Sequence, residues 1–273
     1  YGLYAEDRVL LVPRTLRFGL RERVDSSGRV LVPIDWEQAK CLATEVENSG
    51  VKAVAICLLN AFMNPVHETA IRELLLEAAP DLDVSVSTDI SPEIREYERT
   101  STTVLNALLM PVVRGYVERL GARLGETGTE PRVLLIQSNG GMCTPGVAAQ
   151  QPARLLLSGP CGGAIAAEHL SQVLSFENLV AVDMGGTSFD ISLVHQGRAA
   201  MVTEGEIDGC PVRLPMVDIR TIGAGGGSIA RVDDSGRLRV GPESAGADPG
   251  PACYGHGGTL ATVSDANLTL GRL

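Results

Sequence analysis

The stretch VAVDMGGTSFDISL, residues 180–193, is the most informative part of this 273-residue chain. An apolar run ends at Asp183, a Gly-Gly-Thr-Ser turn covers residues 185–188, and alternating apolar and polar residues follow. This order predicts a buried strand, a tight turn and a second strand. Glycines let backbone N–H groups close on an anion, and the hydroxyls of Thr187 and Ser188 add donors. The stretch therefore predicts a phosphate-binding loop; the alternative is an ordinary hairpin turn beside an exposed aspartate.

Two carboxylates, Asp183 and Asp190, flank this turn. Because like charges repel, Asp183 needs a bridging cation beside a phosphate, and Mg²⁺ prefers such hard oxygen ligands. We expect Asp183 to bind Mg²⁺ through water and Asp190 to orient the water of the metal or the loop, and we predict both as catalytic residues. The phosphate would then lie against the backbone N–H groups of Gly185, Gly186 and Thr187.

A second glycine-rich segment, TIGAGGGSI at residues 221–229, follows further along the chain. It is not a dinucleotide fingerprint, because Ser228 stands where the third small residue belongs, and the chain has no Walker A sequence. We expect a strand that ends in a loop suited to close approach of the backbone to a ligand or to the first loop. Gly225, Gly226 and Gly227 would border the nucleotide; the alternative is a flexible surface loop.

Apolar periodicity predicts an α/β architecture for the first ninety residues. We expect a hairpin over residues 9–33, with strands at 9–12, 16–24 and 30–32, and then helices alternating with buried strands. Asp35 and Gly50 have the residue types that begin and end a helix, and Asn64-Pro65 begins another. The predicted strands of this part lie at residues 51–59 and 83–87, which indicates a parallel or mixed sheet.

Further along the chain the pattern is less regular. We expect a helix from Ser91-Pro92 to about Leu124, with a solvated, salt-bridged face at residues 95–99. The other predicted elements are strands at 133–136 and 155–157, a glycine-rich turn at 158–163 into a helix at 164–170, and an extended loop at 240–258.

Composition excludes several classes of function. With 44% apolar residues the chain can bury a sizeable core, and a formal net charge of -10 argues against nucleic-acid binding. No apolar run approaches the roughly 20 residues that a membrane helix needs. The six cysteines never form Cys-x-x-Cys, so we expect a reducing, cytoplasmic location.

Seven motifs, in order along the chain, resemble the A subunit of the hydantoinase/5-oxoprolinase family. They are REYER (95–99), QSNGG (137–141), SGPCGG (158–163), DMGGTSFD (183–190), IGAGGGSI (222–229), VGPESAGADPGPACY (240–254) and SDAN (264–267). The resemblance implies an actin-like ATPase (ribonuclease H-like) α/β fold, in which the Asp183 loop is the second of two phosphate loops. It also implies two parts, residues 1–88 as the end of the N-terminal domain and residues 89–273 as the hydantoinase A domain.

The resemblance further implies ATP-dependent opening of a cyclic amide, with ATP and Mg²⁺ as cofactors and a hydantoinase B-type subunit as partner. An acetone- or acetophenone-type carboxylase subunit and a non-catalytic actin-like nucleotide-binding module are the alternatives. Family members begin with a first Asp-x-Gly-Gly-Thr loop, which does not occur before residue 183 here. We therefore expect the chain to be an internal fragment of a longer protein, inactive when isolated.

Overall fold

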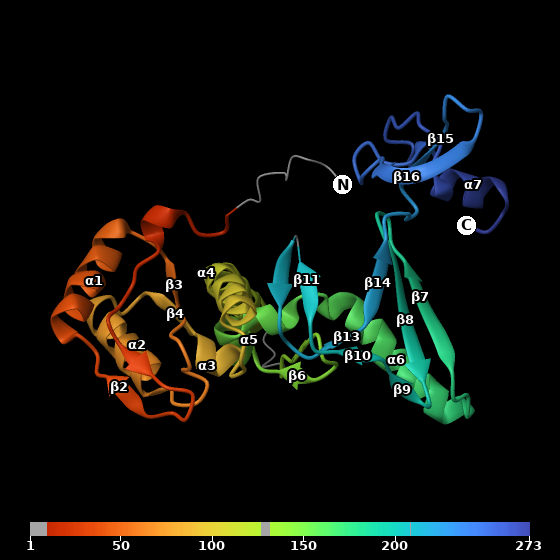
Figure 1. The fold of residues 1–273 in the computed structure, drawn as a ribbon. Helices are drawn as coiled ribbons and strands as arrows, with labels where there is room; N and C mark the ends of the chain where they lie inside the picture. Colours follow the sequence, from red (N-terminus) through yellow and green to blue (C-terminus); the bar gives the residue numbers. More distant parts are fainter. Residues whose placement is uncertain (1–9, 127–131, 208) are drawn as a thin grey trace. The chain divides into compact units, whose positions relative to one another are not determined.

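The computed structural model describes residues 10–126, 132–207 and 209–273, which form two compact units (Figure 1). The first unit extends to Leu156 and also includes Val202–Met216. The second comprises Leu157–Met201 and Val217–Leu273. This division concerns packing and does not test the predicted family-domain boundary near residue 88, which stays a prediction.

A small hairpin opens the first unit. Strands β1 (Arg23–Val24) and β2 (Val30–Val32) pair in antiparallel fashion, and Gly28 takes a φ of 83° in the turn. The turn is where the sequence predicts it, but the strands are shorter. No strand covers residues 10–12 or 16–22, because Pro13 instead leads into a single 3-10 turn at Arg14–Leu16.

A parallel β-α-β unit follows and contains the main core of the first unit. The Asp35 side chain accepts from the Gln38 N–H and begins helix α1 (Trp36–Ser49), and Gly50 ends it with a φ of 68°. Strands β3 (Ala53–Ile56) and β4 (Asp83–Val86) pair in parallel, joined through helix α2 (Val66–Ala78). The predicted alternation of helices and strands is confirmed. Trp36, the first residue of α1, is exposed.

Helix α4 (Glu96–Glu126) is the long helix of the first unit (Figure 1). It begins at Glu96 rather than at Ser91-Pro92, because Arg95 has a φ of 75° and interrupts helical geometry just before it. The N-terminal half of its packed face is polar and fully buried, with Arg99, Thr102, Thr103 and Asn106. The segment 95–99 is therefore not simply a solvated face, although Arg95 and Glu98 do form an ion pair with 3.6 Å between Nη1 and Oε1.

Several short elements complete the description of residues 87–217. They are α3 (Ser87–Ile90), β5 (Leu135–Ile136), β6 (Met142–Cys143), α5 (Pro145–Gln150), a 3-10 helix (Pro152–Leu155), β10 (Met201–Val202), β11 (Gly205–Ile207), β12 (Cys210–Val212) and β13 (Met216–Val217). The predicted strand at 155–157 is wrong, because Pro152 begins a 3-10 turn there and Leu157 takes left-handed geometry.

The second unit is a twisted antiparallel sheet with one covering helix. Its strands are β7 (Leu179–Met184), β8 (Phe189–His195), β9 (Arg198–Ala199) and β14 (Ile219–Ile222), with β8 between β7 and β14 and also paired to β9. Helix α6 (Ser158–Leu174) buries Cys161 and Ala164 against Ala199 and Val217. The SGPCGG motif therefore forms the start of α6 and not a turn before it, because Pro160 is compatible with the first turn of a helix.

Among the described residues of the second unit, no helix covers the face of this sheet opposite to α6. Val180 and Val182 are 64% and 59% exposed, whereas Ser192 and Val194 on the helix side are buried. The prediction that the strand before Asp183 is buried is therefore wrong for one of its two faces. The alternation of side chains across a strand explains the difference.

The C-terminal part of the second unit contains a curled hairpin and a short helix. Strands β15 (Ser228–Val232) and β16 (Leu238–Ser244) pair in antiparallel fashion, followed by a 3-10 turn (Ala252–Tyr254) and helix α7 (Val263–Thr269). The predicted loop at 240–258 therefore begins as a strand. Among the helices in the described ranges, none combines the length and apolar character needed to cross a membrane.

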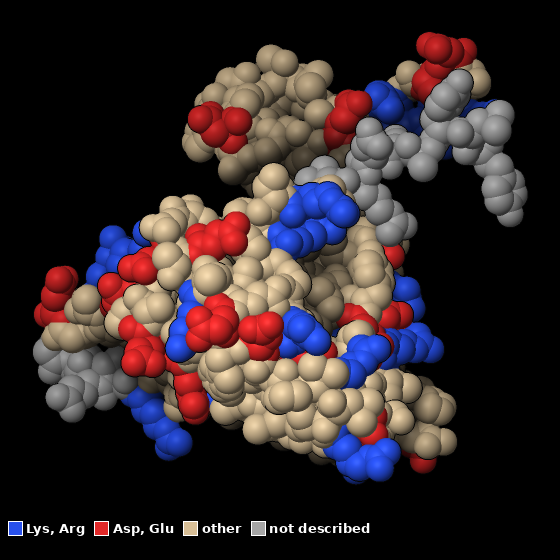
Figure 2. Space-filling view, turned by 60° about the vertical axis from the view of Figure 1, so that its left-hand side comes forward, with Lys and Arg blue, Asp and Glu red and all other residues tan. Residues whose placement is uncertain are grey.

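Charged side chains of both signs mix on the surface. On the face that Figure 2 shows, Lys and Arg side chains lie among Asp and Glu side chains instead of gathering into one basic patch.

Candidate phosphate and metal site

The predicted phosphate loop is the four-residue turn between β7 and β8. The strands pair up to Met184 and Phe189. The Gly185 N–H, expected to face the phosphate, instead donates to the Ser188 carbonyl at 3.0 Å, because it closes the turn. For the N–H groups of Gly186 and Thr187, no acceptor is found in the part of the chain that the structure describes. Both residues are exposed, so the turn offers two free backbone donors to solvent.

Asp183 and Asp190 face each other across the two strands. They are direct partners in the antiparallel register, so their side chains lie on the same face of the sheet. The Thr221 hydroxyl on β14 donates to Asp190 Oδ1 at 2.6 Å, whereas Asp183 is exposed and has no partner within residues 10–126, 132–207 and 209–273. Since like charges placed directly opposite destabilise a sheet, this pair is suited to a cation between or beside the two carboxylates.

No larger group of metal ligands surrounds these two aspartates. The described residues contain no cluster of three or more His, Cys, Asp or Glu side chains that could hold a metal ion. This donor set fits Mg²⁺, which usually keeps several waters and is held by one or two carboxylates and by phosphate oxygens. It does not fit a fully protein-bound zinc site, which needs four protein ligands.

The second glycine loop packs directly on the first. The N–H groups of Gly225, Gly226 and Gly227 donate to the carbonyls of Thr187, Gly185 and Gly186, at 3.2, 2.8 and 2.6 Å respectively. A Cβ atom at Gly225 would lie 2.6 Å from the Thr187 nitrogen, a separation that real Cβ atoms do not show. The segment between β14 and β15 therefore packs on the first turn, and Gly225 in particular is needed for this close approach.

The start of α7 joins this arrangement, and the sequence reasoning gave it no role. The Ser264 N–H donates to the Gly226 carbonyl at 2.8 Å, and Thr262 and Asp265 form a capping box. The SDAN motif (264–267) is one of the seven motifs of the family resemblance, but the resemblance implies no role for its residues. The pattern Thr262-x-x-Asp265 before Leu268 was the available signal, because it marks the beginning of a helix.

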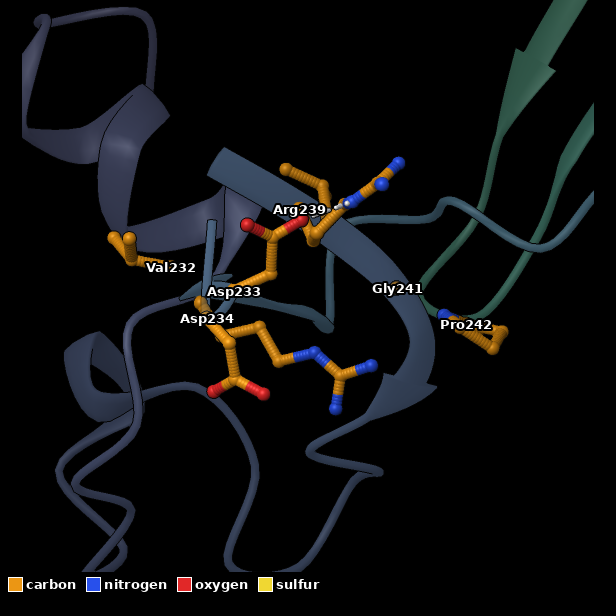
Figure 3. Close-up of a pocket in the computed structure, with 8 residues that line it drawn as sticks. Val232, Asp233, Asp234, Arg239, Gly241 and Pro242 are labelled. Atoms are coloured by element: carbon orange, nitrogen blue, oxygen red, sulfur yellow. Dashed lines mark hydrogen bonds and ion pairs between the residues drawn. The ribbon is translucent and has the colours of Figure 1, made fainter. Parts of the chain in front are cut away.

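A shallow pocket of about 670 Å³ lies in the curl of the β15–β16 hairpin. Figure 3 shows Asp233 and Asp234 on one side of it and Gly241 and Pro242 on the other. The Arg239 Nε and Asp233 Oδ2 atoms are paired at 2.9 Å. A Cβ atom at Gly241 would lie 2.6 Å from the Gly223 carbonyl oxygen, so the wall of the pocket also supports the second glycine loop.

Two other motifs of the resemblance lie in the first unit and have structural contacts there. The Arg99 guanidinium donates through Nη2 to the Leu58 carbonyl at 2.6 Å and lies over the Phe62 ring, 5.5 Å from its centroid. Ser138, in the turn between β5 and β6, is buried and donates to the carbonyl of Arg154 at 2.7 Å. These contacts stabilise the first unit.

Fold and sequence place the chain among α/β proteins with the actin-like ATPase fold. Residues 99–273 match the family model "Hydantoinase/oxoprolinase", and residues 3–79 match "Hydantoinase/oxoprolinase N-terminal region". Since the first match alone covers more than half of the chain, the chain belongs to the hydantoinase/oxoprolinase family. The predicted family and fold class are confirmed.

Relatives within this family have several activities. The chain is 42% identical to caprolactamase subunit alpha of Pseudomonas jessenii, covering 97% of this chain and 38% of the relative. It is 38% identical to acetophenone carboxylase gamma subunit of Aromatoleum aromaticum, covering 96% of this chain and 36% of the relative. The chain thus spans less than two fifths of the length of these two relatives.

Two solved structures share the fold. The ATP-dependent caprolactamase of Pseudomonas jessenii superposes with a TM-score of 0.84 at 41% identity, over 100% of this chain and 40% of that one. The nucleotide-free acetone carboxylase, from work on ATP-dependent acetone carboxylation, gives a TM-score of 0.77 at 32% identity. The latter match covers 96% of this chain and 38% of that chain.

Proposed function

We propose that this chain supplies the phosphate loop of an ATP-dependent enzyme that opens a cyclic amide. The observation that carries the proposal is the hairpin turn with free N–H groups at Gly186 and Thr187, next to the opposed carboxylates of Asp183 and Asp190. Backbone donors suit a phosphate, and hard oxygen ligands suit Mg²⁺. The relation to an ATP-dependent caprolactamase supports the choice of ATP and of a lactam.

In this proposal each residue of the site has a separate task. The N–H groups of Gly186 and Thr187 bind phosphate oxygens, and the hydroxyls of Thr187 and Ser188 lie beside them. The glycines at positions 185 and 186 keep the turn compact. Asp183 holds Mg²⁺ through water, and Asp190, fixed by Thr221, orients that water. Bound Mg²⁺ would neutralise charge on the phosphates. Gly225, Gly226 and Gly227 serve the site by supporting the turn.

The chemistry explains why ATP is needed. An unstrained amide carbonyl is a poor electrophile, so transfer of the terminal phosphoryl group of ATP to its oxygen creates a leaving group. Water then adds to the carbon, and the ring C–N bond breaks as the nitrogen takes up a proton, which leaves an acyl phosphate. A second water hydrolyses the acyl phosphate and releases phosphate. The protein contributes positioning and charge stabilisation at the phosphoryl group.

We further propose a partner subunit of the hydantoinase B type and a cytoplasmic location. Caprolactamase alpha and acetophenone carboxylase gamma are both subunits by name, which supports the partner. A second candidate function, an ATP-dependent carboxylase subunit acting on a ketone and bicarbonate, is favoured by the 38% identity to acetophenone carboxylase gamma. A nucleotide-binding module without turnover is the third candidate.

The test is an assay of the full-length protein purified with its partner subunit. ADP release would be measured with ATP and Mg²⁺ and either a cyclic amide (5-oxoproline, a hydantoin or caprolactam) or a ketone with bicarbonate. We expect ADP release that depends on a cyclic amide and ring-opened product in equal amount. The same assay is run on Asp183→Asn, which should lose this activity, and on the matched control Asp234→Asn, which should keep it, because Asp234 is also exposed and in the second unit. Turnover with ketone and bicarbonate alone would favour the carboxylase, and ATP binding without turnover would favour the module.

A further inference from the structure

A continuous path of backbone hydrogen bonds connects the start of α7 with the phosphate turn. The Ser264 N–H donates to the Gly226 carbonyl at 2.8 Å, and the Gly226 N–H donates to the Gly185 carbonyl at 2.8 Å. Gly226 therefore uses both of its backbone groups to join the helix to the turn. The path is tightly packed, since a Cβ atom at Gly226 would lie 2.8 Å from Ser264 Oγ.

Asp265 fixes the helix end of this path. Its Oδ2 atom accepts from the N–H and from the hydroxyl of Thr262, both at 2.8 Å, and its Oδ1 atom accepts from the Cys253 N–H at 2.7 Å. The carboxylate thus ties together the residue before α7, the first turn of α7 and the 3-10 turn at Ala252–Tyr254.

The charges around this carboxylate agree with such a role. Burial acts to raise the pKa of Asp265, but hydrogen bonds from Thr262 and Cys253 hold this pKa well below its usual range. The pKa of the Cys253 thiol is raised in turn, chiefly by its hydrogen bond to Asp265. Cys253 therefore serves as a donor to Asp265 and is not prepared as a nucleophile.

We propose that Asp265 is a positioning residue for the phosphate turn, acting through Ser264 and Gly226. This inference rests on the proposed function of the turn. When the carboxylate of Asp265 is removed, Thr262 and Cys253 lose the acceptor of their hydrogen bonds, and the start of α7 shifts. The Ser264–Gly226 hydrogen bond must then lengthen or move Gly226 with it. Gly226 is bonded to Gly185, so the displacement reaches the turn that would hold the phosphate.

A competing explanation is that Asp265 stabilises only its own helix. Thr262 has a second attachment, because it bridges to Ile229 on β15, and the Ala230 N–H donates to the Ala261 carbonyl at 2.8 Å. If this bridge alone holds α7 against the second glycine loop, loss of Asp265 would loosen α7 and leave the turn unchanged. The two explanations therefore differ in what happens at residues 183–190.

The test compares Asp265→Ala with Asp233→Ala in the full-length protein by amide hydrogen exchange. Asp233 is a matched control, because it too accepts from backbone N–H groups, those of Ser235 and Arg237, and from the Arg239 side chain. It lies in the β15–β16 turn and has no bond to the phosphate turn. We expect exchange in a peptide covering residues 183–190 to rise about tenfold in Asp265→Ala and to stay unchanged in Asp233→Ala.

Asp265→Asn keeps the proposal testable if the alanine variant does not fold, because the asparagine side chain retains one acceptor oxygen. We expect a smaller rise at residues 183–190 and, with ATP turnover, a higher KM for ATP with a smaller change in kcat. Faster exchange confined to residues 252–269 in both variants would overturn the proposal. The exchange measurement needs no turnover, so a wild-type protein without ATP-dependent activity would refute the proposed function and leave this test valid.

Discussion

The environments of two carboxylates are opposite, that of Glu68 in the first unit and that of Asp183 in the second. Glu68 is fully buried and accepts hydrogen bonds from the Leu58 N–H at 2.8 Å, the Ser87 hydroxyl at 2.7 Å and the Thr88 N–H at 3.1 Å. Asp183 is exposed, lies opposite another carboxylate and has no partner in the described ranges.

The difference separates a structural charge from one that is available to a ligand. A buried carboxylate that is satisfied by three donors fixes the segments that carry those donors, here the ends of β3 and β4. A carboxylate left in solvent beside a like charge contributes nothing of this kind to the fold. Substitutions in the two regions should therefore change different quantities.

The largest effect is expected from Glu68→Ala. This change leaves the N–H groups of Leu58 and Thr88 and the Ser87 hydroxyl without their acceptor inside the protein, so the free energy of unfolding should fall by about 3 kcal/mol or more. Urea denaturation measures it. Glu73→Ala, at an exposed position of the same helix, is the control and should change stability by less than about 0.5 kcal/mol. Equal effects of the two changes would show that Glu68 is not a structural charge.

Asp183→Asn should show the reverse behaviour. The replacement is nearly isosteric and exposed and removes the repulsion from Asp190, so the melting temperature should stay the same or rise slightly. ATP-dependent turnover should lose about 3 kcal/mol of transition-state stabilisation, or roughly two orders of magnitude, through lost metal placement. Steady-state kinetics of the full-length complex would measure this. Full activity in the variant would show that the turn is a structural hairpin without a role in metal placement.

Gly225→Ala tests whether the second glycine loop must touch the first. The added methyl group would meet backbone atoms of Gly186 and Thr187 at 2.6–2.7 Å, so we expect destabilisation of about 1–3 kcal/mol together with impaired ATP binding. Gly223→Ala in the same loop is the control, since its nearest neighbour would be Pro242 at 3.9 Å. Similar stability and ATP affinity of the two variants would contradict the packing described here.

The smallest effect is expected from Gly226→Val. Its obstacle at 2.8 Å is the Ser264 hydroxyl, a side-chain end that can move, and not a backbone atom. We expect about a tenfold loss of turnover, equivalent to about 1.4 kcal/mol, with secondary structure preserved in circular dichroism spectra. Adding Ser264→Ala should recover part of this loss. If turnover in the double variant falls below that of Gly226→Val, steric pressure on Ser264 is not the cause of the loss.

Local signals explain the features that the sequence predicted well. The Asp35 cap and the Gly50 end of α1 depend on a few neighbouring residues, and both are found as expected. The turn after Asp183 and the loop after Ile222 depend on glycine. Packing of the second loop on the first was one of two alternatives that the sequence predicted, and the structure shows it. The assignment of Asp183 and Asp190 to a metal, and of the turn to a phosphate, stays a prediction.

Features that depend on distant contacts were missed. The burial of Arg99 depends on Leu58 and Phe62, which are about forty residues earlier in the chain, so local charge spacing suggested a solvated face instead. The exposure of Val180 and Val182 depends on which face of the sheet α6 covers, a choice that an apolar run does not reveal. The contacts of Asp265 require the 3-10 turn to lie beside α7.

The three hydrogen bonds between the glycine loops also decide which ends of the peptide dipoles in the turn stay open to a ligand. The carbonyl oxygens of Gly185, Gly186 and Thr187 are all occupied from one side by the N–H groups of residues 225–227. A peptide turn normally shows solvent both ends of its dipoles and so attracts cations and anions alike. Here the carbonyl ends already accept hydrogen bonds, so the outer surface of the turn presents mainly N–H ends, and we expect it to favour anions without a basic side chain.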